Sequence, residues 1–366
     1  MKKLIALLAL LMLLLPMSAR AETYPEDPDG AYDDSQVYQI YDTQGNYLTS
    51  RAGQVSPQDE YIAGDNKLYR ILEADPASGR ATAEYLGYEP ANTVTAFGLA
   101  LPASAQEARK VICMYSTHSD ESYEPTDGTS SKTQDAGIYD VGDALKKNLE
   151  ERGIQVTYSQ DTFLPHDAGA YRRSRSTAEE LLKQAPAALL DLHRDGIPDP
   201  SEYEHQLEGQ DVTKVRLLVG RSNANADANR AFAKEIKAVA DEKYPGLIKD
   251  IYIGKGNYNQ ELYPKALLLE FGTHTTDKEE AIQSTQYMAD VLDDVLFGGT
   301  AQAASAQEGR EGFKGAAWLI GGAVLAAVIY VLASSGTFKN LGQRLSRGAS
   351  QLTGGLMGKK PKDGDE

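Results

Sequence analysis

The spacing of hydrophobic positions divides the central part of the chain into two regions. Between residues 36 and 89, short runs such as 37–41 and 68–72 alternate apolar and polar side chains, with turn-forming sequences between them. A period of two with frequent turns predicts a small antiparallel β module. The module has no histidine and no dense acidic cluster. We therefore interpret it as a spacer or binding module rather than a catalytic unit.

Between residues 109 and 297, short apolar runs alternate with longer stretches of helical periodicity. Strands are expected near 110–115, 155–158, 188–192, 215–219, 251–253 and 266–271, and helices near 140–152, 177–184, 226–244 and 278–296. Alternation of this kind predicts an α/β fold, with a mostly parallel sheet and helices on both faces. We expect this region to be the catalytic domain.

Apolar segments near the two ends predict export and membrane attachment. The first follows a basic start and precedes Ala19-Arg20-Ala21, so residues 1–21 are expected to form a secretory signal peptide or, alternatively, an uncleaved anchor. The second, 316–333, has eighteen residues without a charge and is therefore expected to be one transmembrane helix. The basic tail that follows, 334–366, predicts that this end of the chain is cytoplasmic. A tether (22–35) and two linkers (90–108 and 298–315) complete the expected organisation.

The composition limits the classes of ligand that the protein is expected to bind. The net charge is −16, from 37 basic and 53 acidic residues. This balance argues against nucleic acid as a ligand, because phosphate binding needs a basic surface. The single cysteine, Cys113, lies in an apolar run, so we expect a small buried side chain rather than part of a disulfide or a cysteine metal site.

Three of the expected strands carry metal-competent side chains at or just after their carboxyl ends. His118 and Glu121 follow one strand, His193 follows another, and Glu270 lies near the end of a third. In open α/β sheets that edge is where sites form. Imidazole and carboxylate are ordinary zinc ligands, and a catalytic zinc keeps one position for water. The pattern favours a zinc hydrolase with Glu270 as general base, although each residue alone also suits a hydrogen-bonded strand end.

Six segments of the second region resemble the stage II sporulation protein P family. They are residues 117–123 (THSDESY), 140–145 (DVGDAL), 171–175 (YRRSR), 191–195 (DLHRD), 258–260 (YNQ) and 267–272 (LLLEFG). The resemblance implies a fold similar to that of zinc N-acetylmuramoyl-L-alanine amidases, and hydrolysis of peptidoglycan with amidase and endopeptidase activity. It also implies zinc (Zn²⁺) binding by His118 and His193 and catalysis by Glu270, with Glu121 as the expected third ligand.

The same resemblance implies a role in septal wall thinning and engulfment during sporulation. Stage II sporulation proteins D and M are the expected partners, and the catalytic domain is expected outside the cell membrane, at the sporulation septum or engulfing membrane. Amidases of this fold take a glutamate ligand from the first helix, where this chain offers only Asp140 or Asp143.

Substrate binding is expected from four residues of the catalytic region: Arg175, Arg194, Tyr258 and Asn259. An arginine suits a substrate carboxylate because it pairs with both oxygens. Two other functions stay open. One is a zinc carboxypeptidase on wall peptides, which would need such an arginine, and the other is a non-catalytic scaffold that binds the wall.

Overall fold

The computed structural model describes residues 36–89 and 110–298, and its elements largely follow the hydrophobic pattern. The first range holds strands β1 (Val37–Asp42), β2 (Tyr47–Ala52), β3 (Glu60–Ile62), β4 (Lys67–Asp75) and β5 (Arg80–Tyr88). The second holds strands β6 (Val111–Tyr115), β7 (Gln155–Tyr158), β8 (Ala188–Asp195), β9 (Glu204–Leu207), β10 (Gln210–Thr213), β11 (Val215–Gly220), β12 (Ile248–Gly254) and β13 (Ala266–Thr273). Its helices are α2 (Glu124–Asp127), α3 (Gly137–Glu150), α4 (Ala170–Leu182), α5 (Ala226–Lys243) and α6 (Lys278–Phe297), with 3₁₀ turns η2 (Pro200–Glu202) and η3 (Gln260–Leu262).

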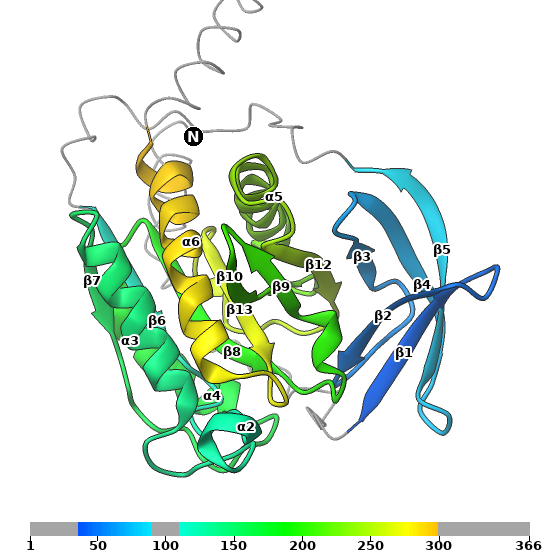
Figure 1. Ribbon diagram of the computed structural model, residues 1–366, viewed down its shortest axis with the longest axis horizontal. Helices are drawn as coiled ribbons and strands as arrows, with labels where there is room; N and C mark the ends of the chain where they lie inside the picture. Colours follow the sequence, from blue (N-terminus) through cyan, green and yellow to red (C-terminus); the bar gives the residue numbers. More distant parts are fainter. Residues whose placement is uncertain (1–35, 90–109, 299–366) are drawn as a thin grey trace, which may run out of the picture. The chain divides into compact units, whose positions relative to one another are not determined.

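In the described part of the chain, eleven strands form one mixed sheet, ordered β2-β1-β5-β4-β3-β12-β11-β13-β8-β6-β7 (Figure 1). Strands β13, β8, β6 and β7 are parallel. Strand β11 is parallel to β12 but antiparallel to β13, and β3 joins the sheet antiparallel to β12. The expected mostly parallel sheet is therefore wrong, and the strands of the β module continue the sheet of the catalytic region.

The connections explain why the sheet is mixed. A parallel neighbour needs a crossover that returns the chain to the opposite edge, and that crossover is usually a helix. Helix α5 provides one between β11 and β12, which are parallel. Between β8 and β11 the chain has only η2 and the β9–β10 hairpin, and between β12 and β13 only η3. Without a crossover helix, the direction of the strand reverses in both places.

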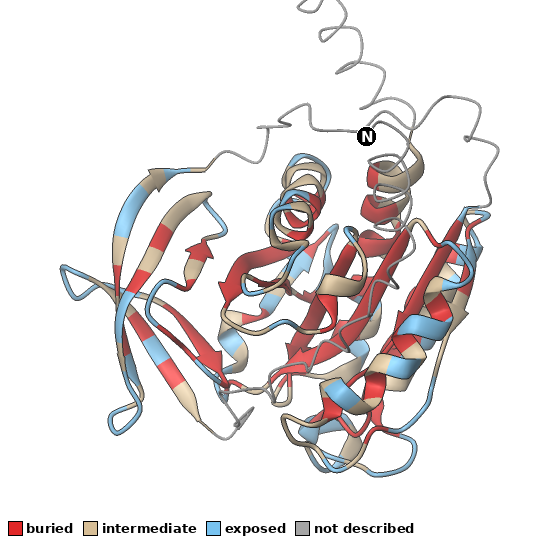
Figure 2. Ribbon diagram, turned by 180° about the vertical axis from the view of Figure 1, so that it is seen from behind, coloured by how far each residue is buried: buried red, intermediate tan, exposed pale blue. Residues whose placement is uncertain are grey.

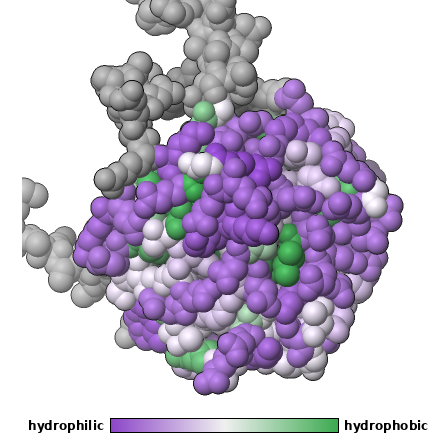
Figure 3. Space-filling model, turned by 60° about the vertical axis from the view of Figure 1, so that its left-hand side comes forward, coloured by the Kyte–Doolittle hydropathy of each residue, from purple (hydrophilic) through white to green (hydrophobic). Residues whose placement is uncertain are grey.

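Apolar side chains fill both faces of the central strands. Buried residues run along β6, β8, β11, β12 and β13 (Figure 2). Helices α3, α5 and α6 cover one face, while α4 and part of the N-terminal strands pack on the other. Cys113 is buried as expected, and burial raises the pKa of its thiol to about 11. On the face shown in Figure 3, hydrophilic residues cover most of the surface and apolar ones form small separate spots.

The predicted fold class needs a second correction, which concerns the expected transmembrane helix. Within residues 36–89 and 110–298, no helix is both long and apolar enough to cross a bilayer. The segment behind that expectation, 316–333, lies outside the described residues, as do the expected signal peptide (1–21) and the basic tail (334–366).

Candidate active site

The candidate chemical residues meet at one edge of the sheet because the strands that carry them are parallel neighbours. His193 is in β8, and its backbone pairs with that of Glu270 in β13. Strand β6 pairs with β8 on the other side, and the turn that follows β6 carries His118 and Glu121. The structure thus brings together four of the residues that the sequence singled out.

Two histidines and a glutamate form a cluster that suits a metal ion. Oε1 of Glu121 lies 3.3 Å from Nδ1 of His118 and 3.2 Å from Nδ1 of His193. One potential ligand atom from each of the three residues lies within 4.8 Å of the others, and all three residues are buried. Two imidazole nitrogens and one carboxylate oxygen are a common protein ligand set for catalytic zinc. The donor chemistry therefore fits this metal.

The charges around the cluster favour a cation. Burial lowers the pKa of His118 to about 4, so its imidazole is neutral near neutral pH and offers a lone pair. Burial also lowers the pKa of His193, but the carboxylates of Asp191 and Glu121 more than offset it and raise that pKa to about 10. A negative field that attracts a proton so strongly also attracts a metal dication.

Two neighbours orient the cluster. Asp191 Oδ1 lies 3.0 Å from Nε2 of His193 and accepts a hydrogen bond from the backbone of Thr117. A carboxylate on the second ring nitrogen is the usual means of fixing a histidine ligand. The backbone N–H of Arg194 donates to Oε2 of Glu121 at 2.8 Å. Although burial raises the pKa of Glu121, His193 and Arg194 hold it well below its usual value.

Glu270 lies beside the cluster with the properties of a general base. Burial and the nearby carboxylate of Asp195 raise the pKa of Glu270 to about 7, although Arg216 and Arg51 oppose the shift. Its Oε2 accepts a hydrogen bond from the hydroxyl of Tyr203 at 3.3 Å. A carboxyl whose pKa lies near the working pH is suited to proton transfer.

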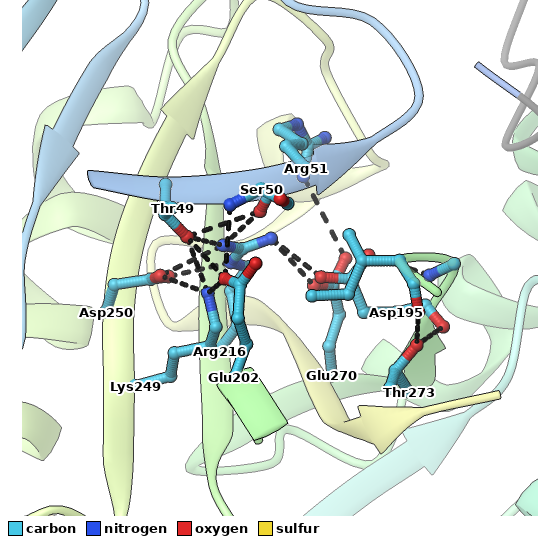
Figure 4. Close-up of polar contacts among 12 residues, drawn as sticks. Thr49, Ser50, Arg51, Asp195, Glu202, Arg216, Lys249, Asp250, Glu270 and Thr273 are labelled. Atoms are coloured by element: carbon cyan, nitrogen blue, oxygen red, sulfur yellow. Dashed lines mark hydrogen bonds and ion pairs between the residues drawn. The ribbon is translucent and has the colours of Figure 1, made fainter. Parts of the chain in front are cut away.

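Two buried arginines beside Glu270 were not expected from the sequence (Figure 4). Arg216, from β11, places Nη1 3.8 Å from Oε2 of Glu270 and 2.7 Å from Oδ2 of Asp195. Its Nε donates to Asp250 at 2.7 Å. Arg51, from β2, places Nη1 3.9 Å from Oε1 of Glu270. The antiparallel direction of β11 explains the position of Arg216, since the start of β11 lies at the edge where β13 ends.

The arginines belong to a larger buried charge network that includes the N-terminal strands. Lys249 Nζ lies 3.1 Å from Asp250, 3.0 Å from Glu202 and 2.6 Å from the hydroxyl of Thr49 in β2. Burial raises the pKa of Asp250, but Arg216 and Lys249 more than offset it and lower that pKa to about 2. The network thus keeps this carboxylate charged inside the protein.

Replacing Arg216 with methionine is expected to destabilise the fold by about 3–5 kcal/mol, because it leaves buried carboxylates without their partner. The free energy of unfolding in a denaturant titration measures the effect. Arg70→Met is the control: Arg70 pairs with Glu60 near the surface, where an ion pair contributes about 1 kcal/mol or less. A cost below about 1 kcal/mol for Arg216→Met would contradict the proposed importance of the network.

The four expected substrate-binding residues are largely engaged by the protein itself. Arg175 pairs with Glu179 and Glu261. Arg194 is buried and donates to the carbonyls of Ser122 and Ser130.

The other two expected substrate-binding residues lie in the turn after β12. Asn259 is buried and donates to the carbonyl of Tyr171 in α4 at 2.9 Å. Tyr258 is half-buried, and its ring makes an edge contact with Tyr171, whose ring in turn contacts His118. Tyr258 is therefore the member of the expected set that is connected to His118 through ring contacts.

The aspartates of the first long helix, α3, lie elsewhere. Asp140 pairs with Lys278 at 2.6 Å, and Asp143 accepts from Gln160 at 3.0 Å. Neither belongs to the cluster formed by the two histidines and Glu121. His166 lies nearer to the cluster, since its ring stacks on that of His118 with ring centroids 4.1 Å apart.

Comparison with known proteins identifies similar sequences and folds. The family model of Stage II sporulation protein P matches residues 27–293. The Stage II sporulation protein P of Bacillus subtilis (strain 168) is 29% identical over 215 residues, which are 54% of this chain and 53% of that protein. The chain therefore spans about half the length of this relative.

Solved structures of amidases are also similar. The N-acetylmuramyl-L-alanine amidase Ami1 from Mycobacterium smegmatis has 14% identity and a TM-score of 0.33, over 51% of this chain and 95% of that one. The CwlD amidase from Clostridioides difficile, solved in complex with the GerS lipoprotein, has 12% identity and a TM-score of 0.34, over 54% of this chain and 99% of that one.

Proposed function

Because the chain belongs to the stage II sporulation protein P family, we propose that it is a zinc-dependent peptidoglycan hydrolase. The reaction is that of an N-acetylmuramoyl-L-alanine amidase, with endopeptidase activity on the same polymer as a second component. The observation that carries the proposal is the buried cluster of His118, Glu121 and His193 at the sheet edge where β13 delivers Glu270.

Each residue of the site has a distinct task in this reaction. His118, Glu121 and His193 would hold the metal, and Asp191 would keep the ring of His193 in place. When bound, zinc supplies Lewis-acid activation of water and of the scissile carbonyl. A carboxylate oxygen of Glu270 takes the proton from the attacking water and then returns it to the amide nitrogen that leaves. The pKa of about 7 lets Glu270 act in both directions near neutral pH.

We assign this activity to thinning of the septal wall and engulfment during sporulation. Membership of the family supports this assignment. The proposed location is the outer side of the membrane at the sporulation septum, with peptidoglycan as substrate and stage II sporulation proteins D and M as partners. Nucleic acid is not a proposed ligand, since the net charge is −16.

The carboxypeptidase alternative receives less support from the contacts around the site. That reaction needs an arginine available for a free terminal carboxylate. Arg175 is paired with two glutamates, and Arg194 donates to backbone carbonyls. The wall-binding scaffold is disfavoured because the three candidate ligands and the candidate base all lie at one edge.

Digestion of purified peptidoglycan by the full chain tests the proposal. We expect stem peptides that begin with L-alanine, identified by mass, and glycan strands that keep the lactyl group. A zinc chelator should abolish the reaction, and added zinc should restore it. Release of single terminal amino acids would identify a carboxypeptidase instead. A chain that neither binds zinc nor releases products would be a scaffold.

A further inference from the structure

Arg51 carries a guanidinium from the N-terminal strands to the candidate general base. Its Nη1 lies 3.9 Å from Oε1 of Glu270, while Nη1 of Arg216 lies 3.8 Å from Oε2. The two carboxylate oxygens therefore face different arginines (Figure 4). Arg51 is 1% exposed, and its Nη1 has no hydrogen-bond partner within the part of the chain that the structure describes. A buried cation is costly unless a charge compensates for it, and Glu270 is positioned to do so.

Contacts on the rest of its side chain fix the direction of Arg51. Its Nε donates to the carbonyl of Gln54 at 3.4 Å, and its guanidinium carbon lies 4.3 Å from the centre of the Tyr252 ring. The guanidinium thus rests on an aromatic face, which is a favourable position for a cation.

The strand that carries Arg51 is fixed as well. Nη2 of Arg216 donates to Oγ1 of Thr49 at 3.0 Å and to the carbonyl of Ser50 at 2.9 Å. These two residues immediately precede Arg51 in β2. Arg216, which faces Oε2 of Glu270, therefore also anchors strand β2, and β2 carries the Arg51 that faces Oε1.

We propose that Arg51 is a positioning residue for Glu270, so that strands β1–β5 complete the active site. This inference rests on the proposed function, in which Glu270 moves the proton. With Arg51 and Arg216 on opposite oxygens, the carboxylate keeps one orientation toward the reacting atoms. Without Arg51 the carboxylate turns toward Arg216 alone, and a displacement of about 1 Å at a catalytic group can cost about 10²-fold in rate.

The variants Arg51→Met and Arg51→Lys of the full chain test the inference on a soluble muropeptide. For Arg51→Met we expect kcat to fall about 10- to 100-fold, with KM and zinc content close to those of the wild type. Arg51→Lys should recover part of the loss, because lysine keeps the positive charge. A purely structural residue would give no such rescue and no selective effect on kcat. An unchanged kcat for Arg51→Met would overturn the inference.

Arg221→Met is the matched control. Arg221 also joins the two described ranges, because its Nε donates to Asp59 at 2.9 Å and its Nη2 to the carbonyl of Pro57. It forms no ion pair with Glu270 among the described contacts, so we expect nearly wild-type kcat. Equal losses in Arg221→Met and Arg51→Met would show that only the attachment of the N-terminal strands matters, and would overturn the positioning role.

Thermal unfolding tests the contact without any turnover. Arg51→Met should lower Tm more in the wild-type background than in a Glu270→Gln background, because the second background already lacks the charge that Arg51 faces. If Arg51→Met lowered Tm equally in the two backgrounds, Arg51 and Glu270 would not interact, and the inference would be overturned. A wild-type chain that binds zinc but leaves peptidoglycan intact would instead overturn the proposed function, so the two failures can be told apart.

Discussion

Replacing His193 with alanine is expected to abolish zinc binding and, with it, hydrolysis of peptidoglycan. His193 is central to the candidate site, since Nδ1 lies 3.2 Å from Glu121 and Nε2 lies 3.0 Å from Asp191. Its loss leaves one imidazole and one carboxylate, fewer than the three protein ligands that a catalytic zinc normally has. The same reasoning predicts loss of zinc in His118→Ala.

Metal analysis of the desalted chain measures this effect directly. The wild type should keep about one zinc per chain, whereas the two variants should keep almost none. His205→Ala is the control, because His205 lies in the β9–β10 hairpin and contacts the carbonyl of Pro245. Full zinc content in both His118→Ala and His193→Ala would rule out this cluster as the metal site.

The meeting of the candidate residues at one edge could be predicted because it depends on local patterns. Each of β6, β8 and β13 is a short apolar run, and the polar residues at its end are visible in the sequence. Parallel pairing of these three strands then puts His118, His193 and Glu270 on one edge. The prediction needed only the strands and their common direction, and in this part of the sheet the direction was right.

The mixed sheet could not be read from periodicity, because strand direction depends on connections and distant pairing. Along the chain, the β9–β10 hairpin lies between β8 and β11, in a stretch where no strand is expected from the sequence. The junction of the two regions rests on pairing of Ile62 with Ile251, residues far apart in the sequence. Hydrophobic alternation in β3 is compatible with many partners, so it does not identify β12.

The two buried arginines differ in how clearly the sequence indicates their burial. Arg216 interrupts the apolar run of β11, and a charge in such a run needs a buried partner. That signal could have pointed to Asp250 and Asp195. Arg51 gave no comparable signal, because it follows Thr49 and Ser50 in a polar stretch of a module that was interpreted as non-catalytic. Its relevance comes from tertiary contact alone.

Replacing Glu270 with glutamine is expected to separate catalysis from metal binding. Glutamine keeps the size of the side chain but cannot take a proton from water. We expect zinc to be retained and kcat to fall by about 10²- to 10⁴-fold, the range for loss of a general base. Glu73→Gln, on the exposed side of β4, is the control and should change neither zinc content nor kcat.

Glu121→Gln should give the opposite result, because Oε1 of Glu121 lies within 3.3 Å of both candidate histidine ligands. His193 and Arg194 hold the pKa of Glu121 well below its usual value despite burial, so a negative charge is lost in this variant. We therefore expect weaker zinc binding, and activity that returns as zinc is raised. Zinc titration of both variants, followed by kcat at saturating metal, makes the distinction. If Glu270→Gln loses zinc while Glu121→Gln keeps it, the two glutamates have exchanged roles, and Arg51 then faces a metal ligand rather than a base.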